Sequence, residues 1–217
     1  MDYFRQEIEM IRQTPILYIG RKSVSALYHH IMGFGSAMHR FGITDKIEKL
    51  LPLPIMQGYF HDYVANYYNY SESTAGWCNI ILQENDFDEE KGYEMFLKLF
   101  DIFSSLSIQH CLYAKLNGDA ISYHNTNKYA PKKTLAPDYV QIEPLYRNPV
   151  EVYLFELSHN AGYIHMINTD TQHCLHTGMH KHENNAAAYL KNSFGPDFRW
   201  CDMDVENYKF YLELLVF

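Results

Sequence analysis

Long apolar runs are missing from the sequence. No stretch approaches the ~18 apolar residues that a membrane-spanning helix needs, so nothing in the 217 residues predicts a membrane span. The N-terminal segment MDYFRQEIEMIRQT is polar and charged and lacks the apolar core of a signal peptide. We therefore expect a cytoplasmic protein.

Cysteines are few and scattered, with no Cys-x-x-Cys pair. A chain of this length buries enough apolar surface to fold without disulfide cross-links. We therefore expect reduced, mostly buried thiols rather than a disulfide framework. No local pattern around them indicates a catalytic cysteine. The cysteines are Cys78, Cys111, Cys174 and Cys201.

Basic residues are in the minority, because 18 Lys and Arg oppose 26 Asp and Glu and leave a net charge of −8 with neutral histidines. Proteins that bind nucleic acid contact its phosphates with basic stripes, so this balance opposes general affinity for nucleic acid. An acidic surface suits a basic protein partner, because opposite fields speed encounter and disfavour wrong partners.

Motifs of common catalytic sites are also lacking. The chain contains no glycine-rich phosphate-binding loop, no Asp-x-Gly-x-Gly, no Gly-x-Ser-x-Gly and no His-Glu-x-x-His. Paired carboxylates occur only in one acidic run that we expect to be exposed, whereas catalytic carboxylates need surroundings that perturb them. The sequence therefore predicts a protein that is not an enzyme and that needs no cofactor.

What the sequence does contain is a helical pattern over its first ~105 residues. Apolar residues recur at helical spacing in residues 2–13, 24–34 and 86–105, and in the segments MQGYFHDYVANYYNY and SESTAGWCNIILQEN. We expect Ser23 to cap the second helix and either Asp86 or Asp88 to cap the last. Glycines are expected to limit the length of the second helix; they are Gly33, Gly35 and Gly42.

The segment TPILYIG connects the first two predicted helices. Pro15 is expected to end the first helix or to force an extended step. Gly20 is expected to adopt a positive φ angle before the second helix begins. We predict a tight elbow that packs Tyr18 and Ile19 into the helical core.

Strand patterns follow in the second half. HCLYAKL and AISYHN flank Asn117-Gly118, a strong hairpin signal. VEVYLFELS and GYIHMINT predict a second hairpin around HNAG, QHCLHTG suggests a further strand, and the last segment YKFYLELLVF favours a strand. ENNAAAYLKNSFG predicts a helix that ends at Gly195-Pro196.

Helices followed by meandering strands predict an α+β fold, with a helical N-terminal half and a mainly antiparallel β-sheet half that carries one or two helices. We expect a helical region over residues 1–105 and an α+β region over residues 106–217, packed together as one unit.

The first half also resembles a known family. TPILYIGRKSVSALYHHIMGF, followed by NYSESTAGWCNIILQENDFDEEKGYEMFLKLFDIF, is similar to a large bacterial family with a Pro-x-x-Tyr-Ile-Gly opening, a Trp-x-x-x-Ile block and a Glu-Glu-x-x-aromatic helix. Its members are often encoded near polymorphic toxins. Over residues 1–105 the resemblance implies an immunity protein that binds a cognate toxin and neutralises it by occlusion. The opening also looks like the DNA gyrase B ATPase domain, but the residues that hold Mg–ATP there are absent.

The densest acidic run is QENDFDEEKGYE, residues 83–94. It is either a solvated helix N-terminus whose carboxylates the helix dipole favours, or an acidic docking face for a basic toxin surface with exposed aromatic anchors. Calcium is disfavoured, because the ligand spacing of an EF-hand is missing. The candidate partner-binding residues are Glu84, Asp86, Phe87, Asp88, Glu89, Glu90 and Tyr93.

Histidines gather between residues 165 and 182, around Cys174. Imidazole and thiolate are the usual ligands of zinc, so this segment supports an alternative function as a metal-dependent hydrolase. If residues 172–178 form a strand, however, His173 and His176 point to opposite faces. Surface or hydrogen-bonding histidines are therefore the first interpretation. The weak metal candidates are His173, His176, His180 and His182.

Overall fold

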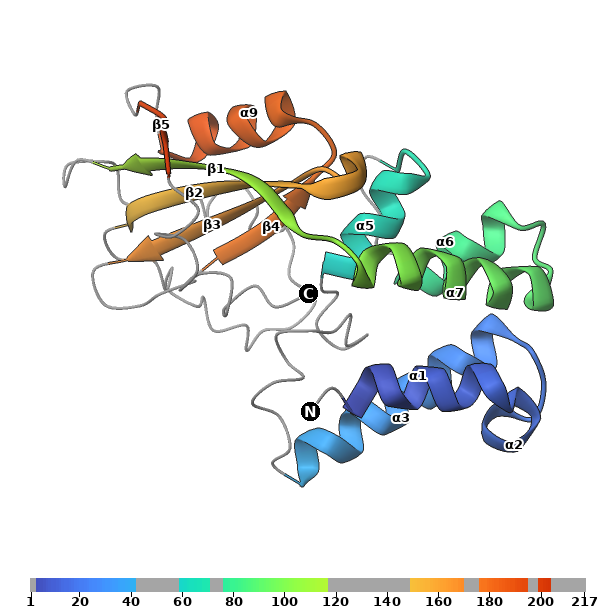
Figure 1. Ribbon diagram of the computed structural model, residues 1–217. Coiled ribbons are helices and arrows are strands. Elements are labelled where there is room, and N and C mark those ends of the chain that lie inside the picture. Colours follow the sequence, from blue (N-terminus) through green and yellow to red (C-terminus); the bar gives the residue numbers. More distant parts are fainter. Residues whose placement is uncertain are drawn as a thin grey trace, which may run out of the picture. The chain divides into compact units, whose positions relative to one another are not determined.

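The computed structural model describes residues 3–41, 59–70, 76–116, 149–169, 176–194 and 199–203. Helices occupy the N-terminal half and an antiparallel sheet occupies the C-terminal half, so the fold is α+β as the sequence predicts (Figure 1). The chain divides into two compact units. The helical unit comprises the described residues up to Gln109 together with Leu157–Gly162, and the sheet unit comprises most of the remainder. The packing of the two regions as one unit stays a prediction.

The described residues of the helical unit form six helices. All of them except α2 bury apolar side chains, and the buried side chains of α5, α6 and α7 meet in an aromatic core around Phe60. Phe60 makes edge-to-face contacts with Trp77, Phe96 and Phe103. The helices are α1 (Tyr3–Gln13), α2 (Pro15–Ile19), α3 (Val24–Arg40), α5 (Tyr59–Tyr67), α6 (Gly76–Glu84) and α7 (Glu89–Ser104).

Helix α3 is longer than the sequence predicts. It begins after Ser23, whose hydroxyl accepts a hydrogen bond from the Ala26 amide at 3.0 Å, as expected. It then runs through Gly33 and Gly35, so the prediction that these glycines limit it is wrong. A helical glycine costs about 1 kcal/mol relative to alanine, and tertiary packing outweighs this cost where the Phe34 ring contacts Phe4 on α1.

The elbow between α1 and α3 also differs from its prediction. Helix α1 ends at Gln13, two residues before Pro15, as predicted. Pro15 then takes the first position of helix α2, where its missing N–H leaves no helical hydrogen bond unmade. Tyr18 and Ile19 are only half-buried and do not enter the core. Gly20 does adopt the predicted left-handed conformation, with φ +75°, and its N–H donates to the Ile16 carbonyl at 3.2 Å.

We predict that Gly20→Ala destabilises the protein by about 1 kcal/mol, because an L-residue in the left-handed region costs roughly 1–2 kcal/mol. A Cβ atom on Gly20 would meet nothing within 4 Å, so the cost comes from the backbone alone. Gly33→Ala is the matched control, because Gly33 also has open space but lies inside α3, where alanine is favoured over glycine. Thermal melts should shift in opposite directions, and equal shifts would refute the role of Gly20.

In the described part of the chain, the sheet has five strands in the order β4-β3-β2-β1-β5. Strands β2 and β3 form the predicted antiparallel hairpin, with Tyr153 opposite Met166, and β4 pairs antiparallel with β3. The short β5 pairs with β1. The elements are β1 (Ile108–Lys115), β2 (Pro149–Leu157), the 3-10 turn η1 (Ser158–Asn160), β3 (Tyr163–Thr169), β4 (His176–His180), α9 (Glu183–Phe194) and β5 (Cys201–Asp202).

Helix α9, predicted from ENNAAAYLKNSFG, packs on strands β3 and β4 (Figure 1). Its Leu190 joins Val152 and Ile167 in a buried cluster, with Tyr189 and Trp200 beside them. Other predicted features lie outside the described residues. They are the strand AISYHN with its Asn117-Gly118 turn, Gly42, Gly195-Pro196, His173, Cys174 and the last segment YKFYLELLVF.

Candidate partner-binding surface

The turn between α6 and α7 holds Phe87 out of the protein. Asp86 and Phe87 are consecutive residues in the left-handed region, with φ angles of 57° and 59°. The Phe87 N–H donates to the Leu82 carbonyl at 2.8 Å, which fixes this conformation. The ring is nevertheless 73% exposed. A bulky residue with positive φ is a backbone outlier that costs roughly 1–3 kcal/mol, and here no burial of the ring offsets that cost.

Two carboxylates of the acidic run are used as structural caps. Asp88 is the N-cap of α7 and accepts hydrogen bonds from the Glu90 and Lys91 amides at 3.1 and 3.0 Å. The hydrogen bond from the Lys91 amide, helped by the Lys91 charge, lowers the pKa of Asp88. The sequence prediction that Asp86 or Asp88 caps this helix is confirmed for Asp88.

Glu89 caps a different helix. Its carboxylate accepts hydrogen bonds from the Ser23 hydroxyl at 2.8 Å, the Ser25 amide at 3.0 Å and the Ser25 hydroxyl at 2.8 Å, at the N-terminus of α3. Partial burial by itself would raise the pKa of Glu89, but the hydrogen bonds from Ser25 and Ser23 outweigh it, so the pKa lies below its usual value. Glu89 therefore joins α7 to α3, and its predicted contact with a partner stays a prediction.

Other carboxylates of the run do face solvent. Glu90 and Glu94 are both exposed and form ion pairs with Lys22 at 3.4 and 3.6 Å. The hydrogen bond with Glu90 raises the pKa of Lys22. Glu84 is exposed and accepts a hydrogen bond from the Tyr70 hydroxyl at 2.8 Å, and Asp86 is exposed beside Phe87. Some carboxylates of the run therefore cap helices and others lie on the surface, and the docking interpretation stays a prediction.

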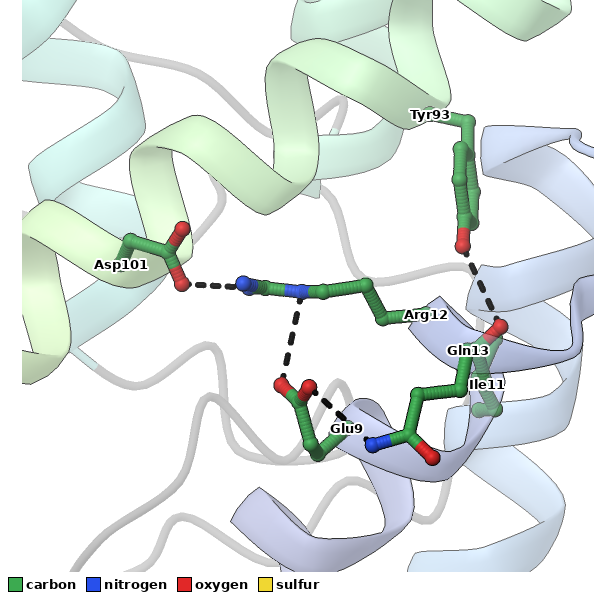
Figure 2. A network of polar contacts seen from close by, with 6 residues as sticks. All are labelled: Glu9, Ile11, Arg12, Gln13, Tyr93 and Asp101. Carbon is green, nitrogen blue, oxygen red and sulfur yellow. Dashed lines mark hydrogen bonds and ion pairs between the residues drawn. The ribbon is translucent and has the colours of Figure 1, made fainter.

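Tyr93 does not serve as an exposed anchor. Its side chain is 2% exposed, and its hydroxyl donates to the Ile11 carbonyl at 3.4 Å (Figure 2). The pKa of Tyr93 is raised because burial removes its phenol from water. Tyr93 precedes Phe96 by three residues and so falls on the apolar stripe of α7, a signal that the sequence already contained.

A polar network near Tyr93 joins α1 to α7. Arg12 binds Asp101 on α7 and lies 3.6 Å from the Glu9 carboxylate, which also accepts a hydrogen bond from Gln13 (Figure 2). The hydrogen bond that Arg12 donates to Asp101 raises the pKa of Arg12. This network has a structural role, because it joins the C-terminal end of α1 to α7.

Sequence reasoning missed an apolar feature on α2. Ile16 and Leu17 are 69% and 78% exposed, although TPILYIG predicts an elbow packed into the core. The turn after α2 contacts the first turn of α7 through Lys22 and Glu90. Helix α2 and the α6–α7 turn therefore lie at the same end of the helical unit (Figure 1). We call Ile16, Leu17, Asp86, Phe87 and Glu90 the end surface.

The histidine-rich segment brings two imidazoles together. His165 Nδ1 and His180 Nε2 are 2.7 Å apart, and His182 is exposed. For His176 the structure describes the backbone position in β4, opposite Ile167. Among the described residues, no group of three or more His, Cys, Asp or Glu side chains is placed to hold a metal ion.

The described cysteines are free thiols, two buried and one exposed. Burial raises the pKa of Cys78 to about 11 and that of Cys111 to about 12, so both are protonated near neutral pH and are poor nucleophiles. Cys201 is the exposed thiol.

Comparisons of the chain with known protein families, curated proteins and solved structures find no match. The family resemblance of residues 1–105 therefore stays a prediction. No helix in the described ranges is both long enough and apolar enough to cross a membrane.

Proposed function

We propose that this chain is a cytoplasmic immunity-type protein that binds a cognate bacterial toxin and neutralises it by occlusion. The observation that carries the proposal is Phe87, an exposed aromatic ring that the α6–α7 turn holds in a left-handed conformation within an acidic run. Strained backbone persists where the surrounding structure enforces it, and it is common at binding sites.

The end surface has the composition of a binding site. Interfaces derive most of their affinity from a few apolar or aromatic anchors surrounded by polar groups. Phe87 on one turn and Ile16 and Leu17 on α2 supply such anchors, and Asp86 and Glu90 supply negative charge beside them. The partner is therefore expected to carry apolar recesses within a basic surface, over a standard interface of roughly 1,600 Å². Occlusion of a toxin needs no catalytic group on this chain.

The test uses the protein encoded by the neighbouring open reading frame as the binding partner. Phe87→Ala should speed dissociation by about 30-fold or more, because loss of an interface hot spot costs at least about 2 kcal/mol and each 1.4 kcal/mol is a factor of ten. Phe41→Ala is the matched control, since Phe41 is equally exposed, at 76%, but lies at the far end of α3. Surface plasmon resonance measures both rates, and equal dissociation rates for the two variants would count against Phe87 as an anchor.

The charges are tested in the same assay. Asp86→Lys combined with Glu90→Lys should slow association, most visibly at low salt, because rim charges act mainly on encounter. Asp88 and Glu89 are left unchanged because they cap α7 and α3, and their reversal would damage the fold. Association that is insensitive to the charge reversal at every ionic strength, with an unchanged circular dichroism spectrum, would move the docking face elsewhere.

The alternative is a metal-dependent hydrolase built on residues 165–182. The observation that favours it is the contact of His165 with His180. Metal analysis of the purified chain separates the two functions. Stoichiometric zinc that is lost on His180→Ala would favour the hydrolase, and metal-free protein that binds the neighbouring gene product would favour the immunity role.

A further inference from the structure

The imidazoles of His165 and His180 form a hydrogen-bonded pair inside the sheet unit. His165 lies on β3 opposite Gly178, and His180 lies on β4 opposite Tyr163, so the two histidines are diagonal neighbours across an antiparallel pair. Their ring nitrogens are 2.7 Å apart, and His165 is only 1% exposed.

Neighbouring residues hold the pair in place. A Cβ atom on Gly178 would lie 2.8 Å from His165 Cε1, so the glycine leaves room for the ring to lie over β4. Tyr189 of α9 contacts both imidazoles, with ring centroids 4.9 Å from His165 and 5.5 Å from His180. The pair therefore joins three elements, namely β3, β4 and α9.

A hydrogen bond between two imidazoles limits how many protons they hold. One nitrogen donates its N–H and the other must offer a bare lone pair. The pair keeps this bond when both rings are neutral or when one is protonated. When both rings are protonated, two N–H groups and two positive charges face each other, and the bond is lost.

Charged and titratable groups on the neighbouring elements do not remove this conflict. Tyr163 faces His180 across the strand pair, and burial together with the charges of Glu156 and Glu183 raises the pKa of Tyr163. Glu156 and Glu183 act on Tyr163, and neither carboxylate restores a lone pair between the two imidazoles. Lys181 follows His180 in the chain, and its ammonium charge opposes a second positive charge on the pair.

We propose that the His165–His180 pair is a proton-sensitive latch, in which a second proton breaks the hydrogen bond and loosens β4 and α9 from β3. In the unfolded chain both histidines take up protons at an ordinary pKa of about 6.5. The folded, latched state then binds one proton fewer in mild acid, so its stability falls as the pH falls. This inference is independent of the proposed toxin-binding function, which uses the helical unit.

Hydrogen exchange of the full-length protein, freed of metal by a chelator, tests the latch. Exchange rates of the amides of residues 176–190 are first corrected for the intrinsic exchange rate. Their protection factors should then fall between neutral pH and about pH 5. The fall should be about tenfold per pH unit, over the range in which the unfolded chain binds the second proton and the folded pair does not. His180→Gln retains hydrogen-bonding atoms but cannot take up a proton, so its protection should be flat over the same range. His182→Gln is the matched control and should keep the wild-type pH dependence, because His182 is exposed.

Two results would overturn the latch. The first is a wild-type protection that stays constant down to about pH 5, well below the ordinary histidine pKa. The second is a His180→Gln variant that loses protection with acid as the wild type does. If this variant does not fold, nitrogen NMR of the wild-type rings decides instead. The His165–His180 pair should take up its two added protons in two separate steps, the second at lower pH than the first. Uptake of both protons in a single step would refute the proposal.

Discussion

Replacing Phe60 with alanine should lower the free energy of unfolding of the helical unit by about 3–5 kcal/mol, the usual range for deleting a buried aromatic side chain. Phe60 is fully buried and touches Trp77, Phe96 and Phe103 with ring centroids 5.3–5.7 Å apart. Its removal leaves a cavity between α5, α6 and α7. That cavity adds to the lost transfer free energy, because the surrounding rings relax only in part.

Urea denaturation measures the loss, with Trp77 fluorescence as the probe of the helical unit. The chain's other tryptophan, Trp200, lies in the sheet unit, so Trp200→Phe provides a background in which Trp77 reports alone. Phe41→Ala carries the same substitution at a 76% exposed site and should change the free energy of unfolding by no more than about 0.5 kcal/mol. Similar losses for the two variants would mean that Phe60 does not centre the core.

Glu89→Gln should cost about 2–3 kcal/mol near neutral pH, since hydrogen bonds to a charged group contribute about 1.5–3 kcal/mol and are not additive. The carboxylate accepts from Ser23 and Ser25 at the positive end of the α3 dipole. A glutamine would present an amide N–H group to these donors. Glu90→Gln is the control, because Glu90 forms only an exposed ion pair with Lys22 and should cost no more than about 1 kcal/mol.

The pH dependence of this effect has a defined sign. Because the folded-state pKa of Glu89 is lowered, its ionised form contributes stability above the ordinary glutamate pKa of about 4.3. That contribution is lost as the pH falls through the folded-state pKa, whereas the glutamine variant does not titrate there. The stability gap between wild type and Glu89→Gln should therefore narrow in acid. A gap that widens with falling pH would contradict the capping role.

The α+β fold could be predicted from the sequence because its signals are local. The apolar stripe of α7 and the Asp88 cap lie within one helix, and the β2–β3 hairpin joins strands that are neighbours in the chain. Such elements depend on residues a few positions apart, which a periodic pattern reports directly. The sequence also indicated that the acidic run around Phe87 lies at the surface, because a dense group of carboxylates before the apolar stripe of a helix is usually solvated.

Only the tertiary structure determined which distant residues the side chains of these elements contact. Glu89 meets Ser23 and Ser25 over 64–66 residues of sequence, so its capping of α3 has no local signature. The end of α3 was wrongly predicted, because packing against α1 outweighs the intrinsic cost of glycine in a helix. The elbow was wrongly predicted as well, because Tyr18 and Ile19 are only half-buried and Ile16 and Leu17 are exposed.

His165 and His180 show the same difference between what the local sequence determines and what long-range packing determines. The sequence by itself determined that histidines cluster near an antiparallel pair of strands. Only the register of β3 against β4 places His165 beside His180, because a shift by one residue turns every side chain to the other face of the sheet. Local pattern therefore determined which elements form, and long-range packing determined which of their polar groups meet.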